Sequence, residues 1–375
     1  MPSLFGRSLT SAELARHVGD VSQVLGVRLV EHLDGPERGV RVLEFRTGGG
    51  LAFDVLVDRC FDLAGLTADG VPIGWHSPTG FRSPWLHETD AEGGLGFLRS
   101  FSGVMNTCGL DHVMGMAEES AEHYDYPYRS RVRHGLHGRA SYIPARLVGY
   151  GVRWEGERGV LWAEGEVRQA AMFAENLLLT RRIEAEVGGD AVSISDRVTN
   201  LGFHPTPHAL LYHMNFGWPV VDEGTRLIAP LRRTLHTFHD PSRTRIGPVE
   251  QVGPQANFRE QVYEHELACE DDGTSFAALA NPELRGGMGV LVAYDARALP
   301  GFFEWQNLQE GNYVVGLEPA TIHAGSREDW QRRGELIRLG HGESRDYRLR
   351  VEVLRGAAAI AEAEARAAKL VPAAT

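Results

Sequence analysis

The sequence predicts an all-β protein, with one large antiparallel domain built as a sandwich of two extensive sheets. Three segments, residues 177–187, 191–200 and 346–354, alternate apolar and polar side chains with a period of two, which is the pattern of half-buried strands. Glycine-containing turns, for example at residues 186–191 and 271–275, recur between such segments. Helical periodicity is confined to the two ends of the chain, which leaves the body of the protein to β-structure.

The two expected helices lie at these ends. Thr10 precedes Glu13 by three residues, a capping-box pattern that should open a short helix in residues 10–18. The Ala/Glu-rich tail, residues 356–375, is rich in helix formers and should be a helix that is loosely attached to the domain. Since the rest of the chain has no internal repeat and no break in composition, residues 1–355 should form a single domain.

Composition and charge limit the kinds of function. Of the 375 residues, 43% are apolar and 23% are charged, which is the balance of a soluble, folded protein. The formal net charge of −12 argues against binding to nucleic acid or to an anionic membrane, because both require basic surfaces. We therefore expect a small-molecule ligand.

Cysteine usage and the N-terminus predict the compartment. The three cysteines, Cys60, Cys108 and Cys269, form no CxxC pair and no disulfide framework, which favours a reducing environment. The N-terminal residues lack the apolar core of a signal peptide, and no window approaches the ~18 apolar residues that span a bilayer. We expect a cytoplasmic protein.

The first candidate site is the stretch RHGLHGRASYIPA, residues 133–145. His134 and His137 lie three residues apart, each beside a glycine, and Arg139 follows them. Glycine lets a backbone or a ligand come close, so this is not an ordinary core strand. On their own, these histidines fit loop or strand-edge residues as well as they fit ligands or catalysts.

The second candidate site is the stretch HALLYHMNFGWP, residues 208–219. Strand pleating directs His213 and Asn215 to the same side, roughly 7 Å apart along the strand. The opposite face, which includes Tyr212 and Met214, is fully apolar. The pair fits either a buried histidine satisfied by hydrogen bonds or a functional polar face.

The third candidate site is the stretch NYVVGLEPAT, residues 312–321. Glu318 interrupts an apolar strand, where a carboxylate is costly unless it is paired or hydrogen-bonded. Gly316 on the same face leaves open space beside it, and Pro319 should end the strand. A structural ion pair is the alternative to a catalytic carboxylate.

Glu304 is a rival to Glu318. It precedes Trp305, whose flat indole face suits stacking on the apolar side of a sugar ring. Signatures of several other enzyme classes are missing from the sequence, which has no GxSxG elbow, no P-loop, no GxGxxG after a strand and no HExxH.

Two further stretches offer residues that could line a pocket. Asp58, Arg59 and Asp62 cluster at the end of a predicted strand, where a salt-bridged turn is the default explanation. Asn106 and Cys108 lie in the second stretch, and we interpret Cys108 as a small buried residue.

Together these segments resemble the aldose 1-epimerase (galactose mutarotase) superfamily, and more closely its DUF4432 branch. The resemblance covers nearly the whole chain, and its order and spacing are more specific than any one motif. The segments that carry it are VLVDRCFDLAGL at 55–66, GVMNTCGLDH at 103–112, LHGRASYIPA at 136–145, LLYHMNFGWPVVD at 210–222, YVVGLEPAT at 313–321 and GELIRLGHGESRDYRLRVEV at 334–353. The fold implied is the β-supersandwich.

The resemblance also implies residue roles. His137 in LHGR matches a histidine that binds substrate, His213 in LYHMNF matches the acid, and Glu318 in GLEPAT matches the base. Asn106 lies in a stretch that contacts substrate, although the arginine usual there in galactose mutarotases is not evident. The branch motif DRGMD appears here as DRCFD, so its arginine and second aspartate match and its glycine does not.

The reaction implied by the resemblance interconverts sugar anomers and needs no cofactor. Glu318 would take the proton of the anomeric hydroxyl while His213, as imidazolium, protonates the ring oxygen. The ring opens, the C1–C2 bond rotates, and reclosure inverts C1. Besides these two residues, the expected contacts with the sugar come from His137, Arg59, Asn106, Arg139, Asn215 and Trp305.

Two alternatives stay open on the same fold. In the first, His137, His213 and Glu318 bind zinc or manganese and drive isomerisation, lactone opening or elimination on a sugar or sugar acid. In the second, the same residues bind a carbohydrate without reaction, since a fold alone does not decide function. The sequence leaves open which sugar is bound and whether the chain forms a homodimer.

Overall fold

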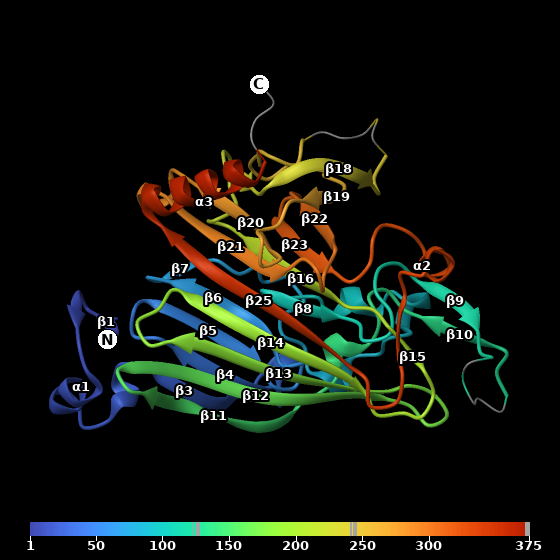
Figure 1. The fold of residues 1–375 in the computed structure, drawn as a ribbon, viewed down its shortest axis with the longest axis horizontal. Coiled ribbons are helices and arrows are strands. Elements are labelled where there is room, and N and C mark those ends of the chain that lie inside the picture. The colour runs from blue at the N-terminus through green and yellow to red at the C-terminus, as the bar shows by residue number, and fades with distance from the viewer. Residues whose placement is uncertain (123, 125–127, 241, 243–245, 372–375) are drawn as a thin grey trace.

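The structure is a computed structural model that describes residues 1–375 except 123, 125–127, 241, 243–245 and 372–375. The prediction of an all-β protein is confirmed, because far more of the described residues lie in the strands of large antiparallel sheets than in helices (Figure 1). Within the described residues, three sheets are large, one more than the two that the sequence predicts, and three further sheets have two strands each.

Each of the three large sheets runs from one edge to the other in the following order of strands. The eight-stranded sheet consists of β11 (Arg146–Glu155), β12 (Arg158–Ala170), β13 (Asn176–Glu186), β14 (Ala191–Asn200), β25 (Ser344–Arg355), β21 (Met288–Asp295), β20 (Thr274–Asn281) and β17 (Arg226–Ile228). The six-stranded sheet consists of β18 (Leu231–Thr237), β19 (Gln261–Leu267), β22 (Gly301–Asn307), β23 (Val314–Ala320), β16 (Leu211–Gly217) and β8 (Met105–Cys108). The five-stranded sheet consists of β3 (Gly26–Glu31), β4 (Arg41–Arg46), β5 (Leu51–Leu56), β6 (Asp62–Ala68) and β7 (Val71–Pro72).

The small sheets pair β1 (Ser3–Leu4) with β2 (Arg7–Ser8), β9 (Ala117–Ser120) with β10 (Arg131–His134), and β15 (Thr206–His208) with β24 (Ile337–Leu339). The main hydrophobic core draws residues from all three large sheets, such as Phe45 of β4, Ile183 of β13 and Met214 of β16. The three strands predicted from alternation are β13, β14 and β25, and their apolar residues are buried as predicted.

Arg181 is a charged residue on the buried face of β13. It is fully buried, and its guanidinium contacts Asp62 of β6 and Asp196 of β14. A buried charge is tolerated only when it is paired and hydrogen-bonded. Arg181 is therefore tolerated on the buried face because it is paired with one carboxylate from the neighbouring strand β14 and one from β6 of the five-stranded sheet.

The helices agree with the sequence in part. The capping box of Thr10 and Glu13 opens α1 (Ser11–His17), as predicted. The tail forms α3 (Gly356–Leu370), which lies beside strands of the eight-stranded sheet (Figure 1). The expected loose attachment is wrong, because Ile360, Ala363 and Ala367 are buried against residues of that sheet.

One helix was not predicted. The helix α2 (Arg327–Arg333) is only seven residues long, too short to show a period. Its signals are local: a capping box between Ser326 and Asp329 and a left-handed Gly334 at its end.

The six-stranded sheet has two distinct faces. Tyr212, Met214 and Phe216 of β16 and Leu317 of β23 point into the main core. Met214 lies opposite Leu317 in the antiparallel register, so His213 lies beside Glu318 on the other face. Side-chain alternation thus directs the apolar residues to the core and the two titratable residues away from it.

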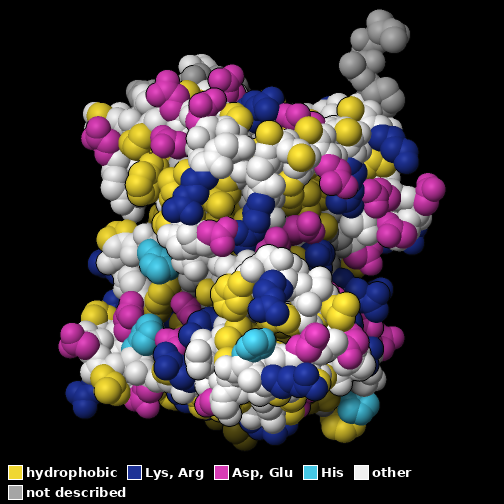
Figure 2. All heavy atoms as spheres, turned by 90° about the vertical axis from the view of Figure 1, so that its left-hand side faces the viewer, with side chains coloured by type: hydrophobic (Ala, Val, Ile, Leu, Met, Phe, Trp, Pro, Cys, Tyr) yellow, Lys and Arg dark blue, Asp and Glu magenta, His cyan; other side chains and the backbone are white. Residues whose placement is uncertain are grey.

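Acidic and basic side chains are intermixed on the face of the molecule in Figure 2.

Among the described residues, no helix is long and apolar enough to cross a membrane.

Candidate active site

A cavity of about 630 Å³ lies over the polar face of the six-stranded sheet. The sheet contributes His213, Glu318 and Trp305 to its wall. The segment before β8 contributes Phe97 and Phe101. Further lining residues, including His137 and Arg327, come from the loop before the 3₁₀ turn at 140–142 and from the start of α2. The cavity therefore joins segments that are far apart in the sequence.

His213 and Glu318 form the centre of the cavity wall. The His213 Nε2 atom lies 3.1 Å from Glu318 Oε1, and both side chains are about 95% buried. No described residue makes a hydrogen bond to that carboxylate oxygen. Glu318 can therefore still accept a hydrogen bond from a ligand in the cavity.

Gly316 leaves the space predicted from the sequence. A Cβ atom at this position would lie 3.0 Å from Glu318 Oε1 and 3.1 Å from His213 Cε1, closer than most real Cβ contacts. The predicted strand end at Pro319 is slightly early, because β23 runs one residue further to Ala320.

Asn215 fixes the orientation of the His213 ring. Its Oδ1 atom lies 2.6 Å from His213 Nδ1, while its Nδ2 atom donates to the carbonyl oxygens of Gly103 and His213. Because the Asn215 Nδ2 atom faces these two acceptors, its Oδ1 atom must face the histidine. Oδ1 is an acceptor, so we assign a proton to His213 Nδ1. His213 Nε2 then faces Glu318 and the cavity with its lone pair or with the exchangeable proton.

Burial shifts both groups toward their neutral forms. Burial, and secondarily the negative charge of Glu260, raise the pKa of Glu318 well above its usual value. Burial, and secondarily His137, lower the pKa of His213 well below its usual value, and the hydrogen bond to Asn215 opposes this. Both directions favour the neutral forms, in which the exchangeable proton of the pair lies on Glu318.

His137 lies next to this pair in a left-handed turn. Its φ of 58° is followed by 75° at Gly138, and its backbone N–H donates to the Met114 carbonyl oxygen. The ring centroid lies 5.6 Å from that of His213 and 4.9 Å from that of Phe97. Burial lowers the pKa of His137 to about 4, so its imidazole is neutral at pH 7.

Trp305 contributes an aromatic wall. Its ring centroid lies 5.2 Å from that of His213 and 5.6 Å from that of Phe101. Its indole N–H donates to Glu260 Oε2 over 2.8 Å, which fixes the plane of the ring. The structure thus brings His137, His213, Glu318 and Trp305 together around one cavity.

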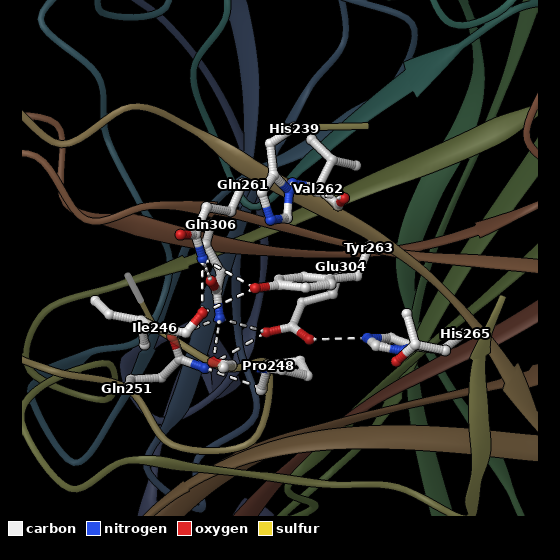
Figure 3. A network of polar contacts seen from close by, with 12 residues as sticks. His239, Ile246, Pro248, Gln251, Gln261, Val262, Tyr263, His265, Glu304 and Gln306 are labelled. Atoms are coloured by element: carbon white, nitrogen blue, oxygen red, sulfur yellow. Dashed lines mark hydrogen bonds and ion pairs between the residues drawn. The ribbon is translucent and has the colours of Figure 1, made fainter. Parts of the chain in front are cut away.

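Glu304 lies on the opposite face of β22. It is opposite Leu317 in the register, whereas Phe303 is opposite Glu318. Figure 3 shows the network in which the Glu304 carboxylate accepts hydrogen bonds from His265, Gln251 and Gln306. The rival carboxylate therefore does not face the cavity.

Arg59 does not lie on the cavity wall, contrary to the expected contact with the sugar. Its side chain is buried against Tyr142 and donates to the carbonyl oxygen of Ser100, which directly precedes the cavity residue Phe101. Its neighbour Cys60 has a φ of 54°, so the cysteine of DRCFD occupies a left-handed position that suits the glycine of DRGMD.

Asn106 and Arg139 are also displaced from their expected roles. Asn106 is buried in β8, opposite His213 in the register, where its Oδ1 atom accepts from the Asn215 amide at 3.4 Å. Arg139 lines a separate polar cavity that also holds Asp111 and Glu175. Neither residue lines the cavity of His213 and Glu318.

His134 is a buried residue at the end of β10, an edge strand of a two-stranded sheet, which agrees with the strand-edge alternative. Its Nε2 atom lies 2.8 Å from Glu119 Oε1, and its ring stacks on that of His112. Arg327 contacts Glu119 at 2.9 Å from the cavity side. This buried cluster therefore supports one wall of the cavity.

Several cavity residues have no clear sequence signal. Phe97, Phe101, Glu260 and Arg327 belong to irregular segments or to the first turn of a short helix. Among the residues that the structure describes, no group of three or more His, Cys, Asp and Glu side chains is arranged to hold a metal ion.

Solved structures share this fold. A protein of Klebsiella pneumoniae described as a "putative aldose 1-epimerase" is similar over 98% of this chain and 92% of its own, with a TM-score of 0.84 and 24% identity. A galactose mutarotase-like protein of Clostridium acetobutylicum has a TM-score of 0.57 and 12% identity, over 88% of this chain and 99% of its own. A galactose 1-epimerase of Lactobacillus acidophilus has a TM-score of 0.53 and 14% identity, with the same coverage.

The fold that these proteins share defines the class as a galactose mutarotase-like β-sandwich. Within this class, the chain belongs to the family DUF4432, a domain of unknown function, whose model matches residues 37–353. No curated protein matches the chain.

Proposed function

We propose that the protein is an aldose 1-epimerase-like isomerase that interconverts the anomers of a sugar. The observation that carries this proposal is the contact between Glu318 and His213, two buried side chains whose Oε1 and Nε2 atoms lie 3.1 Å apart at the wall of a cavity. An anomer exchange needs one base and one acid close together. The hydroxyl oxygen and the ring oxygen are bonded to the same carbon, so two groups 3.1 Å apart can serve both.

The proposed reaction begins with the ionised form of the pair. Moving the shared proton from Glu318 to His213 gives a carboxylate and an imidazolium. Glu318 takes the proton of the anomeric hydroxyl, His213 gives its proton to the ring oxygen, and the C1–O5 bond breaks to leave an open-chain aldehyde.

Reclosure restores both groups. After rotation about C1–C2, the O5 oxygen attacks the other face of the carbonyl and returns its proton to His213, while Glu318 returns its proton to O1. Each proton transfer of this kind typically contributes about 10²–10⁴-fold to a rate. The cycle has no net proton change and uses only side chains on the described cavity wall.

The neighbouring residues support this assignment. Asn215 holds the Nδ1 proton, so His213 Nε2 is the atom that exchanges a proton with substrate. Neutral His137 can donate or accept a hydrogen bond to a sugar hydroxyl, and the indole of Trp305 can cover the apolar face of the ring.

The test is anomer exchange measured by NMR exchange spectroscopy on a panel of aldoses, ketoses and uronic acids. We expect acceleration of at least one sugar, which is lost in Glu318→Gln and which a chelator leaves unchanged. Loss of the activity on chelation would favour the metal-dependent alternative. Sugar binding without acceleration would favour a carbohydrate-binding protein, and either result would overturn the proposal.

A further inference from the structure

We infer that the substrate is a neutral sugar with an apolar group away from the anomeric carbon, of which a 6-deoxyaldose is the simplest case. This inference rests on the proposed anomer exchange at the same cavity. That reaction requires a free hydroxyl at C1, so an apolar group that the cavity recognises must lie on another carbon.

The mouth of the cavity is apolar. Leu98, Met116 and Phe238 line it and are 53%, 52% and 44% exposed. They come from three different parts of the chain and meet at one opening. Exposed apolar side chains that converge on a cavity are typical of a ligand-binding groove.

Polar groups of the wall beyond the reacting pair and His137 are mostly engaged within the protein. The Ser326 hydroxyl caps α2 by bonding to Asp329, and Glu260 accepts the indole N–H of Trp305. Arg327 donates to the Asp111 carbonyl oxygen and contacts Glu119. Its buried Nε atom has no hydrogen-bond partner among the described residues.

This wall disfavours a sugar with many hydroxyls far from C1. A hydroxyl that is buried without a partner loses its bonds to water, which is unfavourable. A methyl group at the same position instead gains from burial against the apolar residues of the mouth.

Charge argues for a neutral sugar. The guanidinium of Arg327 is already matched by Glu119 at 2.9 Å, and Glu260 adds a carboxylate to the same cavity. The described wall offers no unpaired cation that could bind the negative charge of a uronate or a sugar phosphate.

The test uses sugars that differ by a single oxygen atom. The pairs are L-fucose with L-galactose, D-fucose with D-galactose, L-rhamnose with L-mannose, and 6-deoxy-D-glucose with D-glucose, with D-galacturonate as the anionic probe. In the best pair, we expect kcat/KM for anomer exchange to be about 10-fold or more higher for the deoxy sugar. Equal or faster exchange of every parent aldose, or a preference for galacturonate, would overturn the inference.

Variants locate the origin of the preference. The triple variant Leu98→Asn, Met116→Gln and Phe238→Asn should bring the ratio of deoxy to parent kcat/KM toward one. Leu33→Asn, at an apolar side chain that is 76% exposed and lies outside the cavity lining, is the matched control and should keep the ratio. An unchanged ratio in the triple variant would overturn the assignment of the apolar mouth.

Binding separates this inference from the proposed function. If no sugar exchanges faster with the protein present, calorimetry on the same pairs still reports affinity. Tighter binding of the deoxy sugars would then support the inference while the proposed reaction fails. Equal affinity within every pair, or no binding at all, would overturn the inference as well.

Discussion

Two buried pairs of glutamate and histidine lie on opposite faces of the same six-stranded sheet, and they differ in how well they are satisfied. Glu304 lies 3.1 Å from His265, and Glu318 lies 3.1 Å from His213. Gln251 and Gln306 complete the hydrogen bonds of the Glu304 carboxylate, whereas no described residue makes a hydrogen bond to Glu318 Oε1.

This contrast shows why distance alone does not identify a catalytic pair. Buried polar groups normally have hydrogen-bond partners, so we interpret the fully hydrogen-bonded Glu304 carboxylate as a structural group. A buried carboxylate that keeps a free acceptor toward a cavity has the capacity to bind and react. Four predictions test the contrast, in decreasing order of the change that we expect to measure.

The largest effect concerns the two carboxylates. We expect Glu318→Gln to lower the rate of anomer exchange by about 10²–10⁴-fold, because glutamine cannot exchange a proton. Glu304→Gln should leave the rate nearly unchanged, since its side chain points away from the cavity. NMR exchange spectroscopy on both variants, with circular dichroism to check folding, measures the contrast. Similar rate losses in both variants would contradict the distinction between the two faces.

Part of this distinction could be predicted from the sequence. The period-two pattern places His213 and Asn215 on one face, and it places Glu304 and Trp305 on opposite faces because they are adjacent. If Trp305 lines the sugar site, Glu304 cannot face the same cavity. The sequence alone therefore indicates that Glu304 does not share a face with Trp305.

Other parts of the site could not be predicted in this way. Phe97 and Phe101 reach the cavity from an irregular segment whose path depends on long-range packing, not on local pattern. Arg59 and Arg139 match the family motifs. However, Arg59 donates to the Ser100 carbonyl oxygen, and Arg139 lines a separate cavity. A motif identifies a segment, but tertiary contacts decide which of its side chains reach the ligand.

The next prediction compares stability. We expect His265→Leu to lower the free energy of unfolding by about 1–3 kcal/mol, because it leaves the buried Glu304 carboxylate short of a partner. His213→Leu should lower it by less, because Glu318 Oε1 has no hydrogen bond to lose and only the Asn215 Oδ1 acceptor is left without its donor. Urea unfolding of both variants provides the measurement. A larger loss of stability for His213→Leu would reverse the roles that we assign to the two pairs.

A smaller effect tests how Asn215 controls His213. In the free enzyme, kcat/KM should fall on the acid side of the pH profile, where a second proton binds to the pair at His213. Asn215→Ala removes the acceptor that raises the pKa of His213, so the acid side should move to lower pH. Asn215→Asp places a carboxylate at Nδ1, stabilises the imidazolium and should move it to higher pH. Shifts in the same direction for both variants would rule out this control.

The smallest effect concerns the charge of Glu260. Its carboxylate raises the pKa of Glu318, so Glu260→Gln should lower that pKa and move the alkaline side of the pH profile to lower pH. Glutamine keeps an oxygen that can accept the indole N–H of Trp305, so the position of the ring is preserved. Because Glu260 is exposed, the shift should be less than about one pH unit and should shrink as salt rises. The pH profiles of kcat/KM for the wild type and Glu260→Gln, recorded at low and high salt, measure this shift. A shift of the alkaline side to higher pH would contradict the assignment of that side to deprotonation of Glu318.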